Sequence, residues 1–228
     1  PFFMRQFSNC HRAVHAQAYY NVWSRDVLRK LHRLNAKIFG IFILLHFADY
    51  SVLLLGRESH LAVMETLRQF YRLGFVEYPL FALFAAQIIL GVALILKRGK
   101  PKGSWAWVQV ILSGYIALFL LQHLGAIVMA RINYDFETTT YFAAGVVSGL
   151  PYGLCYFPYY LLGIVVAFTH ITAAARFAIW PAPARVLHKA LPLIGVVFGL
   201  SVVTALSYCV ADELPKPYQE YLAKSFGD

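Results

Sequence analysis

Five long apolar runs, separated by short polar segments, constrain this chain more than any other feature. The runs cover residues 34–56, 79–96, 105–130, 151–175 and 191–210. A helix needs roughly 20 residues to cross the hydrocarbon core of a bilayer, so each run is long enough to span a membrane. The composition agrees, because 60% of the residues are hydrophobic and only 14% are charged, too few to coat a soluble domain. The sequence therefore predicts an all-α membrane protein with five transmembrane helices packed as a bundle.

Lys and Arg are distributed unequally between the two sets of connecting segments. Residues 1–37, 97–102 and 176–189 hold 14 of the 20 Lys and Arg residues but only one of the 11 acidic residues, Asp26. Because the basic connections of membrane proteins lie in the cytoplasm, we expect the N-terminus there and the C-terminus outside. This pattern accounts for the net charge of +9. No basic stripe with interleaved aromatic residues is present, so nucleic acid is not expected as a partner.

The polar segments divide the chain into three sections. We expect a basic cytoplasmic N-terminal segment at residues 1–32, the transmembrane domain at residues 33–212 and an external tail at residues 213–228. Among the outer connections, residues 57–75 place apolar side chains at helical spacing, and residues 141–149 resemble a second, shorter amphipathic segment. Each would form either a helix on the outer membrane surface or a cap over the end of the bundle. The sequence leaves both alternatives open.

The cysteines and the N-terminal residues exclude several kinds of site and location. Cys10, Cys155 and Cys209 are far apart and form no C-x-x-C or C-x-x-C-H motif. A zinc ribbon, an iron–sulfur cluster and a covalently attached c-type haem are therefore not expected. Residues 1–8 lack the pattern of a cleavable signal peptide. No clear transit peptide is present either, which favours a bacterial inner (cytoplasmic) membrane over a mitochondrial one.

Three of the eight histidines, His46, His123 and His170, lie inside predicted spans. An ionisable side chain inside a membrane points to a function, although a lone histidine is as readily a packing residue. Three histidines on three different helices favour a cofactor. Haem b is the usual reason for opposed imidazoles in a helical bundle, because its iron takes one axial ligand from each face.

Depth in the membrane selects the histidines that can pair. A helix rises about 1.5 Å per residue, so His46, ten residues before Gly56, lies about 15 Å from the outer edge. His123, eight residues before Arg131, lies about 12 Å deep, whereas His170 lies about 28 Å from that edge. The sequence therefore predicts one bis-histidine haem site formed by His46 and His123.

The residues around this predicted site suit a flat macrocycle. Small residues on the same helices leave room for it, aromatic residues flank it, and arginines near the outer ends are placed to meet the haem propionates. Each of these residues also has an ordinary interpretation as a packing residue or as a boundary charge that extends to the interface. The candidate cofactor-binding residues are Gly40, Phe42, Ser113, Gly114, Phe119, Arg57 and Arg131, and His60 is a further candidate for the propionates.

Three stretches around these histidines are similar to those of a known family. The first is G-I-F-I-L-L-H-F at residues 40–47, closed by L-L-L-G at residues 53–56. The second is W-V-Q-x-x-x-S-G-x-x-x-x-F-L-x-x-H-L at residues 107–124, and the third is A-F-T-H-I-T-A-A-A-R at residues 167–176. Residues 30–212 thereby resemble the five-helix dihaem cytochrome b membrane anchor of succinate:quinone oxidoreductases, which are fumarate reductases and succinate dehydrogenases.

The resemblance implies two haems, and this chain matches the ligands of one of them. In the family, histidines of the first and third spans hold an outer haem, which corresponds to His46 and His123. The histidine of the fourth span, here His170, holds an inner haem together with a histidine of the second span, which this sequence lacks. We therefore expect one haem b, with His170 free to serve a quinone. The alternative of two haems stays open, in which His170 finds its partner in His32, His188 or another subunit.

The resemblance implies an electron-transfer subunit rather than an enzyme on its own. It would carry electrons between a quinone and a partner dehydrogenase, whose flavoprotein and iron–sulfur subunits would bind the basic residues 1–37. The inner-side candidates for contacting the quinone, each also an ordinary boundary residue, are His170, Trp105, Gln109 and Lys102. Two other interpretations stay open. One is a stand-alone haem b cytochrome, and the other is a non-redox membrane protein such as a transporter, in which Asp49 would serve a proton or ion path.

Overall fold

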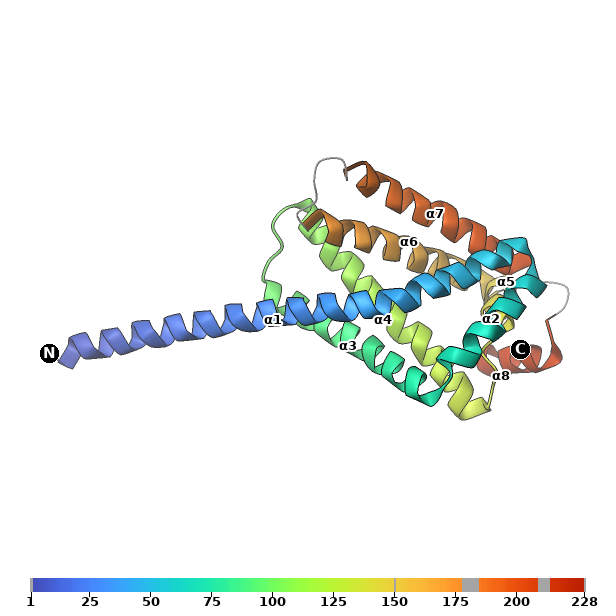
Figure 1. The fold of residues 1–228 in the computed structure, drawn as a ribbon, viewed down its shortest axis with the longest axis horizontal. Coiled ribbons are helices and arrows are strands. Elements are labelled where there is room, and N and C mark those ends of the chain that lie inside the picture. Colours follow the sequence, from blue (N-terminus) through green and yellow to red (C-terminus); the bar gives the residue numbers. More distant parts are fainter. Residues whose placement is uncertain (1, 150, 178–184, 209–213, 228) are drawn as a thin grey trace.

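The computed structural model describes residues 2–149, 151–177, 185–208 and 214–227, and it describes the side chains of residues 24–149, 151–174, 190–208 and 214–227. These residues form helices joined by short connections, and no strand occurs among them. In chain order the elements are α1 (Phe2–Val52), η1 (Leu53–Leu55), α2 (Arg57–Tyr71), α3 (Gly74–Arg98), α4 (Ser104–Tyr134), α5 (Thr140–Ser148), α6 (Gly153–Phe177), α7 (Arg185–Tyr208) and α8 (Lys216–Phe226) (Figure 1).

Five segments of the described chain are long and apolar enough to cross a membrane, which confirms the predicted number of spans. They are Ser24–Leu55, Gly74–Arg98, Ser104–Tyr134, Gly153–Ala174 and Ala190–Tyr208. The first begins earlier than its apolar run because α1 continues through the polar residues before it. α4 likewise continues past its apolar run and ends where Asp135 adopts a left-handed φ of 47°.

The long helices follow one another in space in the order α1, α3, α4, α6 and α7. α6 approaches α4 closely at Gly163, where an added Cβ would lie 2.4 Å from Cε2 of Phe119. Among the described residues, α1 makes no comparably close backbone contact with α4 or α6. Its Phe47 instead contacts the rings of Phe168 and Phe198, at centroid distances of 5.6 and 5.5 Å. Side chains therefore bridge the space between α1 and the helices opposite it.

The short helices α2, α5 and α8 lie together at one end of the bundle, named here the capped end (Figure 1). α5 contacts α6, α7 and α8, while α2 contacts α1, η1 and α3. The main cluster of buried apolar residues also lies at this end, and it consists of Leu53, Ala143, Ala144, Val146, Val147, Val202, Val203 and Leu206. Both predicted amphipathic segments are therefore helices, and the burial of most of α5 identifies it as a cap over the bundle end.

Both ends of the chain contain helical structure that the sequence pattern did not predict. The basic N-terminal segment is continuous with the first span, and the first half of α1 extends away from the bundle on the side opposite the capped end (Figure 1). The predicted tail contains α8, whose buried Tyr218 donates a hydrogen bond of 3.0 Å to the backbone oxygen of Glu137. This contact attaches α8 to the segment between α4 and α5.

Candidate functional site

The structure brings together the two histidines that depth selects. His46 of α1 and His123 of α4 face each other with ring centroids 6.3 Å apart and an angle of 69° between the ring planes. Both side chains are half-buried between the helices. We name them the outer pair, because the predicted topology places them in the outer half of the membrane.

Aromatic rings hold both imidazoles of the outer pair. Phe42, one helical turn before His46, stacks on it at 5.7 Å with an interplanar angle of 18°. Phe119 has the same relation to His123, at 5.5 Å and 9°. This is the i, i+4 spacing at which helical side chains meet. Two predicted flanking residues therefore lie directly beside the histidines.

Tyrosines complete the aromatic surroundings of the outer pair. Tyr50 lies 5.0 Å from the ring of His46, and Tyr160 of α6 lies 6.0 Å from the ring of His123. Neither residue was predicted from the sequence. Tyr50 has a recognisable signal, since it follows His46 by one turn, whereas Tyr160 reaches the site only through the packing of α6 against α4.

The predicted small residues lie in two different surroundings. A Cβ added at Gly40 or at Gly114 would meet no atom within 4 Å, so both glycines border open space. Ser113 instead faces the other end of the bundle. Its hydroxyl donates to the backbone oxygen of Gln109 at 2.7 Å and lies 3.5 Å from Nδ1 of His170.

His170 has a second histidine near it, His32 of α1, and the two rings are close enough to interact electrostatically. We name them the inner pair. His32 lies beside α3: its Nε2 is 3.3 Å from the amide nitrogen of Gln87, and its Cε1 would be 3.6 Å from a Cβ on Gly91. Its buried Nδ1 has no hydrogen-bond partner. α1 thus places a histidine against the part of α3 where the second span has none of its own.

A hydrogen-bond network supports the inner pair from α1 and α3. Asn35, which is buried, donates to the amide oxygen of Gln87 at 2.6 Å and to the backbone oxygen of Leu83 at 2.9 Å. Gln109, a predicted quinone contact, accepts a bond of 2.8 Å from Arg98. Trp105 and Lys102, the other predicted contacts, are exposed around the start of α4. His188 lies outside the residues whose side chains the structure describes.

The two predicted propionate arginines lie at the capped end. Arg57 is the first residue of α2 and is half-buried. Arg131 donates to Glu77 at 2.6 Å and to the hydroxyl of Thr138 at 3.1 Å. In this structure Arg131 therefore holds α4 to α3 and to the segment before α5.

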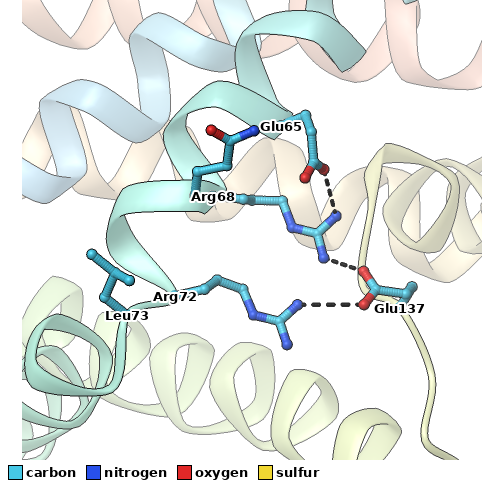
Figure 2. A pocket seen from close by; sticks show the side chains of 6 residues that line it. Glu65, Arg68, Arg72, Leu73 and Glu137 are labelled. Carbon is cyan, nitrogen blue, oxygen red and sulfur yellow. Dashed lines mark hydrogen bonds and ion pairs between the residues drawn. The ribbon is translucent and has the colours of Figure 1, made fainter.

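Arg131 belongs to a larger ion-pair network that Figure 2 shows in part. Arg68 of α2 contacts both Glu65 and Glu137, and Arg72 contacts Glu137 at 3.6 Å. These side chains line an open hollow of about 520 Å³ together with Gln69 and Leu73. The hydrogen bond from Arg68 lowers the pKa of the Glu137 carboxyl. Because each arginine of the hollow already has a carboxylate partner, the network clamps α2 to the segment before α5.

His60, the further propionate candidate, is fully buried at the capped end. Its Nδ1 lies 2.9 Å from the backbone oxygen of Asp49 and 3.3 Å from the carboxylate Oδ1 of the same residue. Its ring centroid is 5.0 Å from that of Tyr50, which also contacts His46. A buried polar chain therefore leads from the outer pair toward the capped end.

The described part of the chain contains no group of three or more His, Cys, Asp or Glu side chains arranged to hold a metal ion. Its candidate ligands are instead two separate pairs of histidines. Comparisons with protein-family models, with curated proteins and with solved structures find no match for this chain.

Proposed function

We propose that the chain is a membrane-anchor b-type cytochrome that carries electrons between a quinone pool and a partner dehydrogenase of the succinate dehydrogenase/fumarate reductase type. The observation that carries this proposal is the outer pair. Two imidazoles from different helices face each other inside a membrane bundle, where an ionisable residue without a function is rare.

The spacing of the outer pair supports a single shared metal. A metal binds an imidazole nitrogen at about 2.0–2.1 Å, and that nitrogen lies about 1.1 Å from the ring centre, so two opposed imidazoles have centres roughly 6.3 Å apart. The observed separation is 6.3 Å. A bare ion in a structural site takes about four protein ligands, whereas haem iron takes only its axial ligands from the protein. A pair of histidines therefore suits haem better than a bare ion, and a Cβ added at Gly40 or Gly114 on the same helices would meet no atom within 4 Å.

His46 and His123 would hold the haem iron, which supplies a one-electron redox couple when bound. Phe42 and Phe119 stack on the two imidazoles and so fix their orientation. The aromatic rings also give the two imidazoles hydrophobic surroundings, which would help to set the redox potential of a metal held there.

A second haem is a further candidate, supported by the inner pair. His170 of α6 and His32 of α1 are close enough for a charge on one to act on the other, and the buried Nδ1 of His32 has no hydrogen-bond partner. His32 precedes His46 by 14 residues, so the two pairs are about 21 Å apart along α1. Two haems at that spacing would carry electrons across most of the bilayer. A quinone held by His170 remains the alternative occupant.

The partner and the membrane belong to the same proposal. The bundle end opposite the cap carries the basic segments and the projecting half of α1. Flavoprotein and iron–sulfur subunits would bind there, in the cytoplasm, and the bundle would lie in a bacterial inner membrane. A partner would also stabilise the part of α1 that projects from the bundle in Figure 1.

The first test is the haem content of the purified full chain, measured as the pyridine haemochrome and in dithionite-reduced minus oxidised spectra. We expect b-type haem in the wild-type protein and the loss of one haem per chain in His123→Ala. His15→Ala is the matched control, because this histidine lies outside the spans, and it should keep the wild-type content.

Each other outcome has a defined meaning. Absence of haem from folded wild-type protein expressed with haem available would overturn the proposal and favour the transporter interpretation. Haem without copurifying flavoprotein and iron–sulfur subunits would favour the stand-alone cytochrome. A haem content unchanged in His123→Ala would exclude the outer pair as ligands.

A further inference from the structure

His60 and Asp49 form a buried polar pair that joins α2 to α1 at the capped end. None of the His60 side chain is exposed, and only 7% of the Asp49 side chain is. The backbone oxygen of Asp49, 2.9 Å from Nδ1 of His60, can only accept a hydrogen bond. Nδ1 therefore carries the proton, and in the neutral ring Nε2 carries a free lone pair.

Both residues keep a polar atom without a hydrogen-bond partner. These atoms are Nε2 of His60 and Oδ1 of Asp49, and each is buried. Because Nε2 has almost no accessible surface, a substrate or a water molecule does not fit beside it. A proton does fit, and its addition turns His60 into an imidazolium next to the buried carboxylate, so that the two charges compensate each other.

The pair is linked to the outer histidine pair by one aromatic ring. The centroid of Tyr50 is 5.0 Å from that of His60 and 5.0 Å from that of His46. His60 and His46 are close enough for a charge on one to act on the other. A positive charge on His60 would therefore stabilise a negative charge added at the outer pair.

Few other titratable groups face this pair in the described part of the chain. From α1 they are His46 and Tyr50, and from α2 the group is Tyr71, which interacts electrostatically with Asp49. Burial raises the pKa of Tyr71 to about 12, so this phenol stays neutral at neutral pH. The arginines that interact with Tyr71 are Arg68, Arg72 and Arg131, and each is paired with a glutamate.

We propose that His60 and Asp49 form a redox-linked proton site: if the outer pair holds haem, its reduction by one electron would be accompanied by the uptake of one proton at Nε2 of His60. This inference rests on the function proposed above, in which a quinol or the partner dehydrogenase supplies the electron. The proton comes from solvent at the capped end, where Asp49 is the member of the pair that remains slightly exposed. One electron and one proton enter together, so the net charge of this buried region does not change.

The linkage is reciprocal, because reduction favours protonation to the same extent that protonation favours reduction. The direction in which the midpoint potential changes with pH is therefore fixed. The midpoint potential of the haem that His123→Ala removes should fall as the pH rises. Its limiting slope is 59 mV for each tenfold change in proton concentration, the value for one proton per electron.

The test is a redox titration of the full-length protein at several pH values, monitored by the absorption spectrum of that haem. His60→Gln keeps an amide that can donate to Asp49 but cannot take up a proton, so its slope should fall close to zero. Asp49→Asn should weaken the slope as well. Glu58→Gln removes an exposed carboxylate on the same helix and should retain the wild-type slope.

Three results would overturn the inference while leaving the proposed function intact. They are a wild-type potential that does not depend on pH, a slope unchanged in His60→Gln, and a loss of slope in Glu58→Gln as large as in His60→Gln. Wild-type protein without any haem would instead overturn the proposed function itself.

A second measurement needs no variant, in case His60→Gln fails to fold. Redox-induced infrared difference spectra of wild-type protein with isotopically labelled histidine should show imidazole protonation on reduction. Spectra without such a band would overturn the proposal.

Discussion

The outer and inner histidine pairs share α1 but differ in their surroundings. The outer pair is packed by phenylalanine and tyrosine rings. The inner pair lies beside amide and hydroxyl groups, and one of its ring nitrogens is buried without a partner. Stacked rings restrict an imidazole to one orientation, whereas polar neighbours allow either nitrogen to carry the proton. We infer that the outer pair is the more rigid site and the inner pair the more adaptable one.

The largest effect should come from His32, because this residue belongs to the inner pair and not to the outer pair. If the inner pair holds the second haem proposed above, His32→Ala should remove that haem and leave the outer one, so that the haem content falls from two per chain to one. His188→Ala is the matched control and should keep the wild-type content. The measurement is the pyridine haemochrome with reduced-minus-oxidised spectra. Loss of the inner haem in His188→Ala instead would transfer the ligand role to His188.

Gly163→Ala should disturb the outer pair alone. The new Cβ would lie 2.4 Å from Phe119, whose ring stacks on His123, and overpacking of this kind costs about 1–3 kcal/mol. Gly125→Ala on α4 is the control, because its Cβ would meet no atom within 4 Å. Thermal unfolding and outer-haem content together measure the effect. Equal stability and equal haem content in the two variants would show that Phe119 moves aside freely.

Asn35→Ala should disturb the inner pair alone. The substitution leaves the amide oxygen of the half-buried Gln87 without its 2.6 Å donor, and an unsatisfied polar group away from water costs about 1–3 kcal/mol. We expect a lower unfolding temperature and a shifted inner-haem potential, with the outer-haem potential unchanged. Ser51→Ala removes a hydroxyl that bonds only to the backbone of its own helix, at Phe47, and serves as the control. A shift confined to the outer haem would contradict this separation of the two sites.

The smallest effect should come from Glu137 at the capped end. The Arg68 hydrogen bond lowers the pKa of Glu137 from its ordinary value of 4.5, so the folded state favours the charged form. Its contribution to stability is complete above about pH 4.5, and it is lost as the pH falls through the lowered pKa. Glu137→Gln should remove this acid dependence from thermal unfolding curves, whereas Glu220→Gln on α8 should retain it. Neither variant should change the haem spectra.

The outer pair could be predicted from the sequence because both histidines lie in apolar runs. Hydropathy locates each run, and the constant rise of a helix converts residue number into depth. The calculated depths of His46 and His123 therefore agree, and the structure brings the two rings close together. His32 precedes the first run, in a segment whose polarity assigned it to the cytoplasm. The 14-residue spacing to His46, close to four helical turns, is the signal that it lies on the same face of α1.

The capped end shows what periodicity alone leaves open. Helical spacing predicted both short outer helices, but only the burial of α5 against α6 and α7 decides between a cap and a surface helix. α8 has no apolar run of its own and is held by its contact with Glu137. The Asp49–His60 pair likewise depends on where α2 turns back onto α1.

The sequence by itself determined the all-helical class, the five spans and the pairing of His46 with His123, because hydropathy and helical rise are properties of one segment at a time. Only the tertiary structure decided that His32 lies near His170, that α5 caps the bundle and that His60 is buried against Asp49. Each of these depends on which side chains of two distant segments meet, and that is set by packing among several helices together.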